Sequence, residues 1–336
     1  MIKSYPRIRD VAQAAGVSTA TVSRALSCPE LVSAETRALV LKAVEATGYR
    51  INHAARNLRR RRTGGIVVLV PNLANPFFSR ILSGITSVMA PVGYNVLIAD
   101  TKQGEHIRDY LHHNRADGLI VLDAKLPEDV LMAGASARYE PPIVFACEWV
   151  ENDNRPRVVI DNMHGAALAV DHLVELGHHR IGHLMGPPDN ILTVTRAEGF
   201  RQAMKRYGLT IRPDWMLKGD FSLASGAEAA HRWLALEDRP SAIFCSSDAM
   251  ACGFIGELHK RGIRVPEEVS VVGFDDIDIA AHFVPALTTI AQPRDLIGQT
   301  AAKTLLAVMQ GQGGEQLQKQ VLEVELIRRQ STARIA

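Results

Sequence analysis

Four side chains near the start of the chain, Thr19, Ala20, Ser23 and Arg24, have the chemistry that suits contact with DNA bases. Methyl groups of Thr and Ala contact thymine, hydroxyls reach bases or phosphates, and an Arg guanidinium forms paired hydrogen bonds with a guanine edge. Apolar residues recur between these four at helical spacing, which predicts that the four share the exposed face of a short helix.

The charge of the chain is divided unevenly around this segment. Residues 1–62 carry 12 Lys and Arg against four Asp and Glu, a net charge of +8, while the remainder carries 26 against 32, a net charge of −6. Clustered basic residues bind phosphates, and an acidic body would be repelled by them. The sequence therefore predicts that the basic head alone contacts a polyanion, with a solvated basic tail as the alternative.

Three short helices are predicted to position the DNA-contacting side chains. The first covers residues 8–15 and ends at Gly16, and the second follows a short turn and begins after the N-cap candidate Ser18. The third begins near Ser33 and ends at Gly48. A short turn between two helices is typical of a helix-turn-helix, although three small helices could also form a purely structural bundle.

The motifs of this head are similar to those of a known family. IRDVA at 8–12, AGVSTATVSRAL at 15–26, VSAETR at 32–37 and GY at 48–49 resemble the headpiece of the lactose/galactose-repressor (LacI/GalR) family of bacterial regulators. The resemblance implies operator contacts in the helix-turn-helix and in a hinge helix that folds on DNA, where a leucine enters the minor groove. The implied DNA-binding residues are Thr19, Ala20, Thr21, Ser23, Arg24, Ala55 and Leu58.

From Gly64 onward, short apolar runs alternate with helical patterns. The runs indicate strands near 66–70, 95–99, 118–122, 143–147, 158–161, 181–184, 242–246 and 269–273. Continuous apolar strands separated by helices, expected near 76–90, 163–176, 195–207, 223–235, 248–261 and 294–309, are typical of parallel sheet buried on both faces. The body is predicted to form two doubly wound α/β lobes with a ligand cleft at the carboxyl ends of the strands.

Polar and aromatic residues that follow these strands are the candidates for lining the cleft. Aromatic faces beside carboxylates and an Arg suit a polyhydroxylated ring, whose C–H groups stack while its hydroxyls form hydrogen bonds. Arg196 is expected to open a helix, and Asp248 could equally cap one. The candidates are Asn75, Phe77, Phe78, Glu148, Arg196, Phe221, Ser247, Asp248 and Asp275.

The body also resembles the same family, through its periplasmic-binding-protein-like domain. The resemblance implies that Phe77, Phe78, Arg196, Phe221, Ser247, Asp275 and Gln292 contact an effector. Ser247-Asp248 stands where many sugar-binding relatives have Asn-Asp, which weakens a simple sugar assignment. PFFS at 76–79, CEW at 147–149 and IAQPR at 290–294 resemble the cytidine-repressor branch, so a nucleoside is a candidate effector.

Other classes of protein have little support in the sequence. The chain lacks G-x-G-x-x-G after its first strand, G-x-x-x-x-G-K-[ST] and G-x-S-x-G, so no cofactor and no enzymatic activity are predicted. No C-x-x-C pair occurs, and His178, His179 and His183 are expected to be solvated surface residues rather than zinc ligands. Without a membrane span or secretory signal, we expect a cytoplasmic protein.

The sequence thus predicts a transcriptional repressor that binds a pseudo-palindromic operator as a homodimer and responds to a sugar or nucleoside. The alternative is a ligand-binding protein or enzyme whose basic head serves assembly. The expected domains are a headpiece at 1–50, a hinge and linker at 51–63 and a body at 64–336. Within the body we expect lobe 1 at about 64–161 and 293–320, and lobe 2 at about 162–292 and 321–336.

Overall fold

The computed structural model describes residues 6–49, 63–103, 107–108, 116–133 and 140–335. The chain forms two compact units, residues 1–62 and residues 63–336. Within the described residues, no helix combines the length and apolar character that a membrane crossing requires.

The first unit contains the three predicted helices, α1 (Ile8–Ala15), α2 (Thr19–Ser27) and α3 (Ala34–Thr47), with a 3₁₀ turn at Pro29–Leu31. Gly16 and Gly48 adopt left-handed conformations at the ends of α1 and α3, which glycine does without a steric cost. Ser33 caps α3 by accepting a hydrogen bond from the Thr36 amide at 3.2 Å. Buried apolar side chains join the three helices in a small core: Val11, Ala12, Val22, Ala25, Val40 and Ala43.

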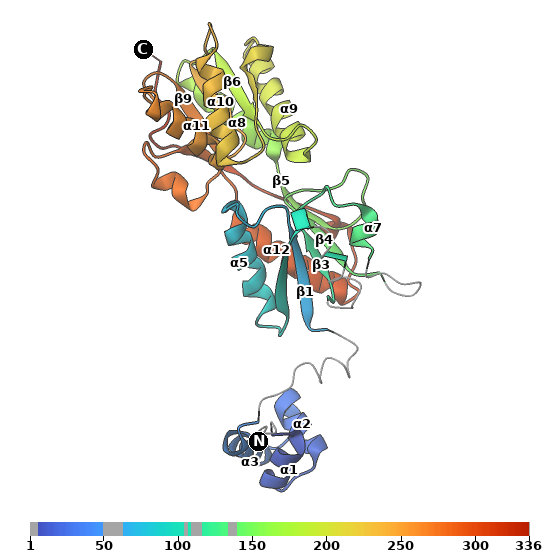
Figure 1. Cartoon of the computed structure of the whole chain (residues 1–336). Coiled ribbons are helices and arrows are strands. Elements are labelled where there is room, and N and C mark those ends of the chain that lie inside the picture. Colours follow the sequence, from blue (N-terminus) through green and yellow to red (C-terminus); the bar gives the residue numbers. More distant parts are fainter. Residues whose placement is uncertain (1–5, 50–62, 104–106, 109–115, 134–139, 336) are drawn as a thin grey trace. The chain divides into compact units, whose positions relative to one another are not determined.

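The second unit consists of two α/β lobes, which confirms the predicted fold class (Figure 1). The first lobe has a parallel sheet in the order β11-β5-β4-β3-β1-β2. Its strands are β1 (Gly65–Val70), β2 (Asn95–Asp100), β3 (Leu119–Val121), β4 (Ile143–Ala146), β5 (Arg157–Ile160) and β11 (Lys319–Leu322). Its helices include α5 (Phe77–Met89), α7 (Glu128–Leu131), α12 (Arg294–Met309) and α13 (Glu315–Gln318), with a 3₁₀ turn at Thr101–Gln103.

The second lobe repeats this architecture, in the order β12-β10-β9-β8-β6-β7. Its strands are β6 (Ile181–Met185), β7 (Met216–Lys218), β8 (Ala242–Cys245), β9 (Ser270–Asp275), β10 (Thr288–Ala291) and the antiparallel β12 (Glu325–Ile327). Its helices are α8 (Asn162–Glu175), α9 (Ile191–Arg206), α10 (Leu223–Leu234) and α11 (Asp248–Lys260), with 3₁₀ turns at Pro213–Trp215 (η3) and Asp278–Ala281 (η4).

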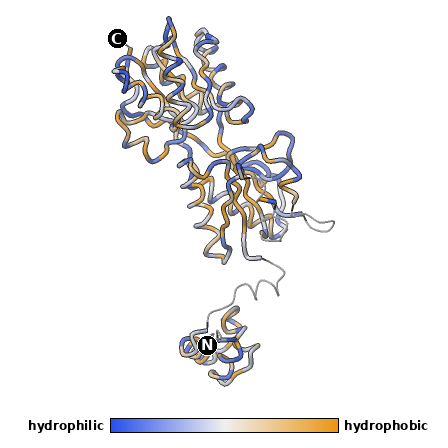
Figure 2. Tube along the Cα trace, in the orientation of Figure 1, coloured by the Kyte–Doolittle hydropathy of each residue, from blue (hydrophilic) through white to orange (hydrophobic). Residues whose placement is uncertain are grey.

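Three segments of the chain pass between the lobes. They follow β5, β10 and β11, and the β11 crossing lies after Leu322 because β11 still pairs with β5 in the first sheet. This places the last change of lobe two residues beyond the expected boundary at 320. Hydrophobic stretches lie along the strands of both sheets (Figure 2), and one cluster of buried side chains extends from Ile66 in the first sheet to Phe274 in the second.

Candidate DNA-binding and effector-binding sites

Helix α2 presents to solvent the side chains that suit base contact. Ser18 begins the helix by accepting a hydrogen bond from the Thr21 amide at 3.1 Å, and Val22 and Ala25 are buried in the headpiece core. Thr19, Ala20 and Arg24 are exposed, and Thr21 and Ser23 are half-buried. Because burial of one face fixes which residues remain outside, α2 offers these side chains as one surface.

The implied hinge helix lies in a part of the chain that is not described. Ala55 and Leu58 fall within residues 50–62, outside the described residues. Their contact with DNA therefore stays a prediction from the sequence.

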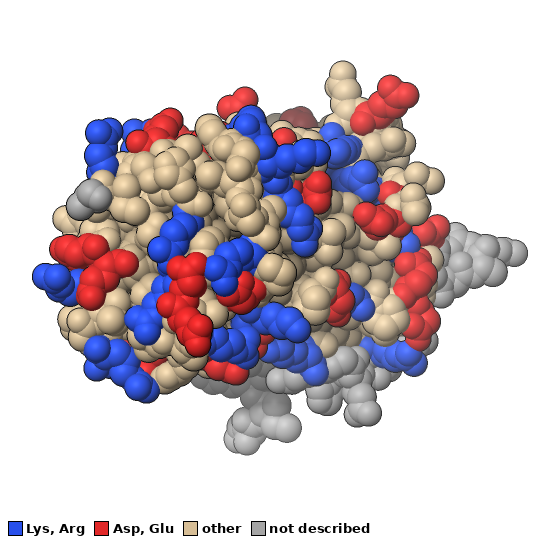
Figure 3. All heavy atoms as spheres, turned by 90° about the horizontal axis from the view of Figure 1, so that it is seen from above, with Lys and Arg blue, Asp and Glu red and all other residues tan. Residues whose placement is uncertain are grey.

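On the face seen in Figure 3, basic and acidic side chains are interspersed, in contrast to the basic excess in the sequence of residues 1–62.

A cavity of about 390 Å³ lies between the two lobes, where strands of both sheets end. Ligand pockets in α/β proteins form at such strand ends because the loops there diverge. Eight of the ten candidate residues line this cavity: Asn75, Phe77, Phe78, Glu148, Arg196, Phe221, Ser247 and Asp275. Phe77 and Phe78 meet edge to face, with ring centroids 5.1 Å apart.

The other two candidates, Asp248 and Gln292, lie behind the lining. Asp248 is fully buried and accepts hydrogen bonds from Thr289 Oγ1 at 2.5 Å and from the Ile277 amide at 2.9 Å. Gln292 donates from Nε2 to Asp275 Oδ1 at 2.7 Å. Both residues therefore hold the Asp275 segment in place rather than forming the surface of the cavity.

Arg196 is the buried cation of this site. It lies in the second turn of α9, because Asn190 caps that helix and starts it four residues earlier than predicted. Its Nε donates to Asn162 Oδ1 at 2.8 Å and its Nη1 to the Ser246 carbonyl at 2.5 Å, and the guanidinium stacks on Phe274. Burial lowers the pKa of Arg196. The hydrogen bonds and the ring contact hold the planar guanidinium in one orientation at the cavity.

Asp275 provides a carboxylate beside this cation, with Oδ1 lying 3.9 Å from Arg196 Nη1. Burial raises the pKa of Asp275 to about 6, while Arg196 and the hydrogen bond from Gln292 oppose the rise. The group is therefore mostly ionised at neutral pH and is available to accept hydrogen bonds from hydroxyl groups. Together, Arg196 and Asp275 offer both donors and acceptors to a polar ligand.

Three residues of the cavity wall have positive φ angles: 66° at Cys147, 68° at Phe221 and 118° at Asp275. Such conformations are uncommon in residues with a side chain and occur often at functional sites. The Phe221 ring lies directly over Gly186, where an added Cβ would be 2.2 Å from Phe221 Cζ. From this position the Phe221 side chain contributes to the lining of the cavity.

Polar residues that the sequence analysis did not select also join the lobes around the cavity. Asn190 Nδ2 donates to Glu148 Oε1 at 2.7 Å, and Lys125 Nζ pairs with Asp189 at 2.7 Å. Burial raises the pKa of Glu148, although its hydrogen bonds oppose that rise. Lys125 comes soon after a predicted strand, so the rule that selected Glu148 could have found it. The same rule could not have found Asn190, because no predicted strand ends directly before it.

The expectation that His178, His179 and His183 are solvated surface residues is wrong for His178 and His183, whereas His179 is exposed. His178 and His183 are buried. Their ring nitrogens lie within hydrogen-bond distance of serine hydroxyls, those of His178 near Ser241 and Ser270 and Nε2 of His183 at 2.7 Å from Ser246 Oγ. Burial lowers the pKa of His183 to about 3, so its ring is neutral. Among the described residues, no group of three or more His, Cys, Asp or Glu is arranged to hold a metal ion.

Comparison with known proteins identifies the family. Residues 7–52 match the bacterial regulatory proteins of the lacI family, and residues 170–332 match a periplasmic binding protein-like domain. The chain is 41% identical to the HTH-type transcriptional repressor CytR of Escherichia coli (strain K12) over 97% of this chain and 96% of CytR. It is 36% identical to the transcriptional repressor PurR of Photobacterium profundum over 89% of this chain and 90% of PurR.

A solved structure of the lac repressor dimer bound to operator and the anti-inducer ONPF is similar in fold. It has a TM-score of 0.84 and 30% sequence identity, and the match covers 98% of this chain and 100% of the repressor chain. Sequence and fold thus agree over both the headpiece and the two-lobed body. The chain belongs to the lacI family of bacterial regulatory proteins.

Proposed function

We propose that this protein represses transcription by binding a two-fold symmetric operator as a homodimer, and that a small effector in the cleft controls the binding. The observation that carries the proposal is the exposed surface of α2, where Thr19, Ala20 and Arg24 lie together on a capped helix. Such a helix fits the major groove. The hinge segment with Ala55 and Leu58 would contact the central minor groove.

The relatives support a regulatory role rather than an enzymatic one. CytR and PurR are named as transcriptional repressors, and the similar lac repressor structure is a dimer on operator DNA. A dimer gives two recognition helices related by one axis, which matches a pseudo-palindromic site. We expect the protein to act in the cytoplasm, where such DNA is accessible, and to need no cofactor.

We propose a nucleoside as the effector, with a sugar as the second candidate. The cavity of about 390 Å³ falls within the usual range for small-molecule sites. Phe77, Phe78 and Phe221 offer rings on which a base can stack, while Arg196 and Asp275 suit ribose hydroxyls. We expect an inducer, whose binding disfavours the ordered hinge and thereby weakens operator binding by about 5- to 150-fold.

The test is fluorescence anisotropy of the full-length protein on a fragment of its own promoter. Operator binding should weaken steeply as salt rises, because phosphate contacts release counterions. Arg24→Ala should weaken specific binding by about 5- to 150-fold, equivalent to ~1–3 kcal/mol, and Leu58→Ala should also weaken it. Lys42→Ala, on the exposed surface of α3, should have a smaller effect.

Two outcomes would contradict the proposal. Operator binding that is indifferent to both Arg24→Ala and Leu58→Ala would refute the assigned interface. The alternative role of the head in assembly would be favoured by two results together. The full-length protein would bind no genomic DNA fragment, and its oligomer would dissociate when the head is removed. A thermal-shift screen of nucleosides and sugars then identifies the effector, and failure of both classes would refute the assigned cleft.

A further inference from the structure

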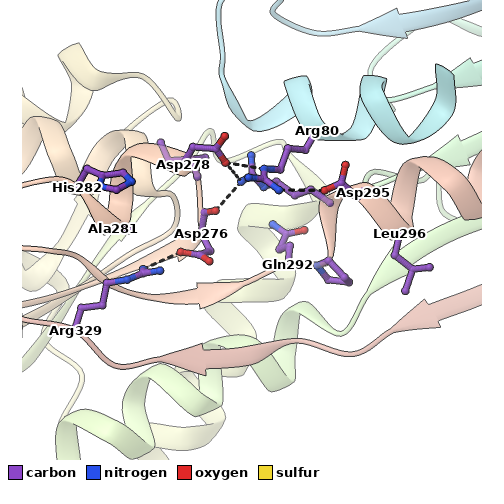
Figure 4. Close-up of a pocket in the computed structure, with 12 residues that line it drawn as sticks. Arg80, Asp276, Asp278, Ala281, His282, Gln292, Asp295, Leu296 and Arg329 are labelled. Atoms are coloured by element: carbon purple, nitrogen blue, oxygen red, sulfur yellow. Dashed lines mark hydrogen bonds and ion pairs between the residues drawn. The ribbon is translucent and has the colours of Figure 1, made fainter. Parts of the chain in front are cut away.

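The short segment from Asp275 to Asp278 separates the effector cavity from a second cavity. Asp275 lines the cavity described above, whereas Asp276, Ile277 and Asp278 line a second cavity of about 600 Å³. Figure 4 shows this second cavity, where charged side chains from the two lobes converge. Four consecutive residues therefore connect a ligand-facing carboxylate to a group of ion pairs.

Asp278 is the centre of these ion pairs and contacts two helices of the opposite lobe. It begins η4 in the second lobe, while Arg80 lies on α5 and Arg294 begins α12, both in the first lobe. Asp278 Oδ1 accepts from Arg80 Nε at 2.7 Å and from Arg294 Nη2 at 2.8 Å. Arg294 Nη2 also donates to the Asp276 carbonyl at 2.7 Å, so the first lobe holds the segment at two points.

The burial of the two arginines differs, and this difference suggests separate roles. The Arg294 side chain is 4% exposed, whereas those of Arg80 and Asp278 are 52% and 63% exposed. A buried guanidinium with two acceptors is a fixed anchor, while an exposed ion pair contributes little stability and breaks readily. The Arg80–Asp278 ion pair is therefore the contact that can form or break when the lobes move relative to each other.

Arg80 and Asp278 each lie three residues along the chain from a residue that lines the effector cavity. Arg80 lies in the first turn of α5, which begins with the cavity residues Phe77 and Phe78. Asp278 follows Asp275 by three residues, and the intervening Asp276 has a positive φ of 51°. A ligand that moves Asp275 or the start of α5 changes the separation of Arg80 and Asp278 through a short path.

We propose that Asp278 is a positioning residue that sets the orientation of the two lobes through Arg80 and so couples cleft occupancy to operator binding. This inference rests on the proposed function and adds the contact that transmits the signal. The coupling requires a two-state element whose equilibrium both sites bias, and the Arg80–Asp278 pair is that element.

The first test needs no effector. Spin labels are attached to Val92→Cys in the first lobe and Tyr207→Cys in the second, both exposed sites, in a full-length Cys28→Ser background diluted with unlabelled protein. Arg80→Gln and Asp278→Asn should each raise the population of a second inter-lobe distance by about two- to fivefold, as expected for the loss of an exposed ion pair. The double variant should resemble Asp278→Asn alone, because that change already removes the partner of Arg80 in the second lobe, and the remaining Arg80–Asp295 pair lies within the first lobe.

Glu175→Gln is the matched control. The Arg328–Glu175 pair has a similar distance of 2.9 Å and similar exposure, but both residues lie in the second lobe. The inter-lobe distance distribution should be unchanged in this variant. Wild-type distributions in Arg80→Gln and Asp278→Asn, or an equal shift in Glu175→Gln, would overturn the proposal.

The second test measures the ratio of operator affinities without and with cytidine. Arg80→Gln and Asp278→Asn should reduce that ratio by about two- to fivefold, while the Kd of cytidine for the free protein changes by less than twofold. A full wild-type ratio in these variants would also overturn the proposal. Failure of the wild-type protein to bind operator or cytidine would instead contradict the proposed function, and the distance measurement would still decide the present inference.

Discussion

Asn190 and Glu148 are joined across the cleft by a hydrogen bond of 2.7 Å between Nδ2 and Oε1, and both side chains are buried. Asn190 also starts α9, because its Oδ1 accepts from the Leu192 amide at 2.8 Å. Glu148 Oε2 accepts from the Ala124 amide at 3.0 Å. One amide thus both begins the helix that carries Arg196 and connects the second lobe to the first.

Asn190→Asp separates these two functions of the side chain. Aspartate retains the capping acceptor but loses the donor and places a second carboxylate against Glu148. We expect the free energy of unfolding to fall by about 1–3 kcal/mol at neutral pH, because a buried hydrogen bond is replaced by repulsion. Chemical denaturation measures the change.

The pH dependence of this variant provides a further check. Repulsion adds to the burial that already raises the pKa of Glu148, so the folded protein prefers the protonated form. The stability deficit should be largest above the raised pKa and should shrink as the pH falls towards 4. Asp189→Asn, at an exposed pair, should remain close to wild type at each pH. A deficit independent of pH would contradict the assigned repulsion.

Effector affinity should decrease as the pH falls through about 6. Burial raises the pKa of Asp275 from 3.8 to about 6, so protonation in this range removes the partner of Arg196 and an acceptor for ligand hydroxyls. The pH dependence of stability has the opposite sign. Because the folded protein holds a proton on Asp275 more tightly than the unfolded chain does, ionisation of Asp275 lowers the free energy of unfolding, and lowering the pH restores it. Calorimetry between about pH 5 and 7.5 measures both, and Asp275→Asn should remove the Asp275 contribution from each. For stability the comparison is the difference between variant and wild type, because buried histidines with lowered pKa values give both proteins a slope of the opposite sign.

Removing the buried cation should damage both stability and effector binding. Arg196→Ala leaves Asp275 buried without its cation, and we expect a loss of about 3–5 kcal/mol in unfolding free energy. Effector binding should fall below detection. Operator affinity should be retained at a temperature where the full-length variant is folded, because the headpiece is a distinct unit of the chain. Arg201→Ala, on the same helix but 51% exposed in its side chain, should stay within about 0.5 kcal/mol of wild type. Comparable losses in both variants would refute the special role of Arg196.

Gly186→Ala should displace the Phe221 ring. The added methyl would lie 2.2 Å from Phe221 Cζ and 2.6 Å from Thr193 Oγ1, so the ring has to leave its position over the glycine. We expect weaker effector binding by about tenfold or more, in line with losing an aromatic contact of ~1.5 kcal/mol. Gly256→Ala is the control, because no atom lies within 4 Å of its added Cβ. It should preserve effector affinity and slightly stabilise α11.

Local sequence signals were sufficient for the headpiece and for most strands. Ser18, Ser33, Gly16 and Gly48 mark helix ends through contacts within a few residues, so their roles are visible in the sequence. Strands such as β1 are buried on both faces and read as continuous apolar runs. The short β7, β10, β11 and β12 were not predicted, because they carry weaker patterns and are defined by the sheets they join.

The sequence alone determined the order of helices and strands, the basic head and the kinds of side chain that follow the strands, because these depend on spacing and local chemistry. Only the tertiary structure decided which of those side chains share a surface. It placed Asp248 and Gln292 behind the cavity, buried His178 and His183, and joined Glu148 to Asn190. Such contacts depend on the packing of segments far apart in the chain, and no local pattern encodes the direction in which a side chain points after two lobes have formed.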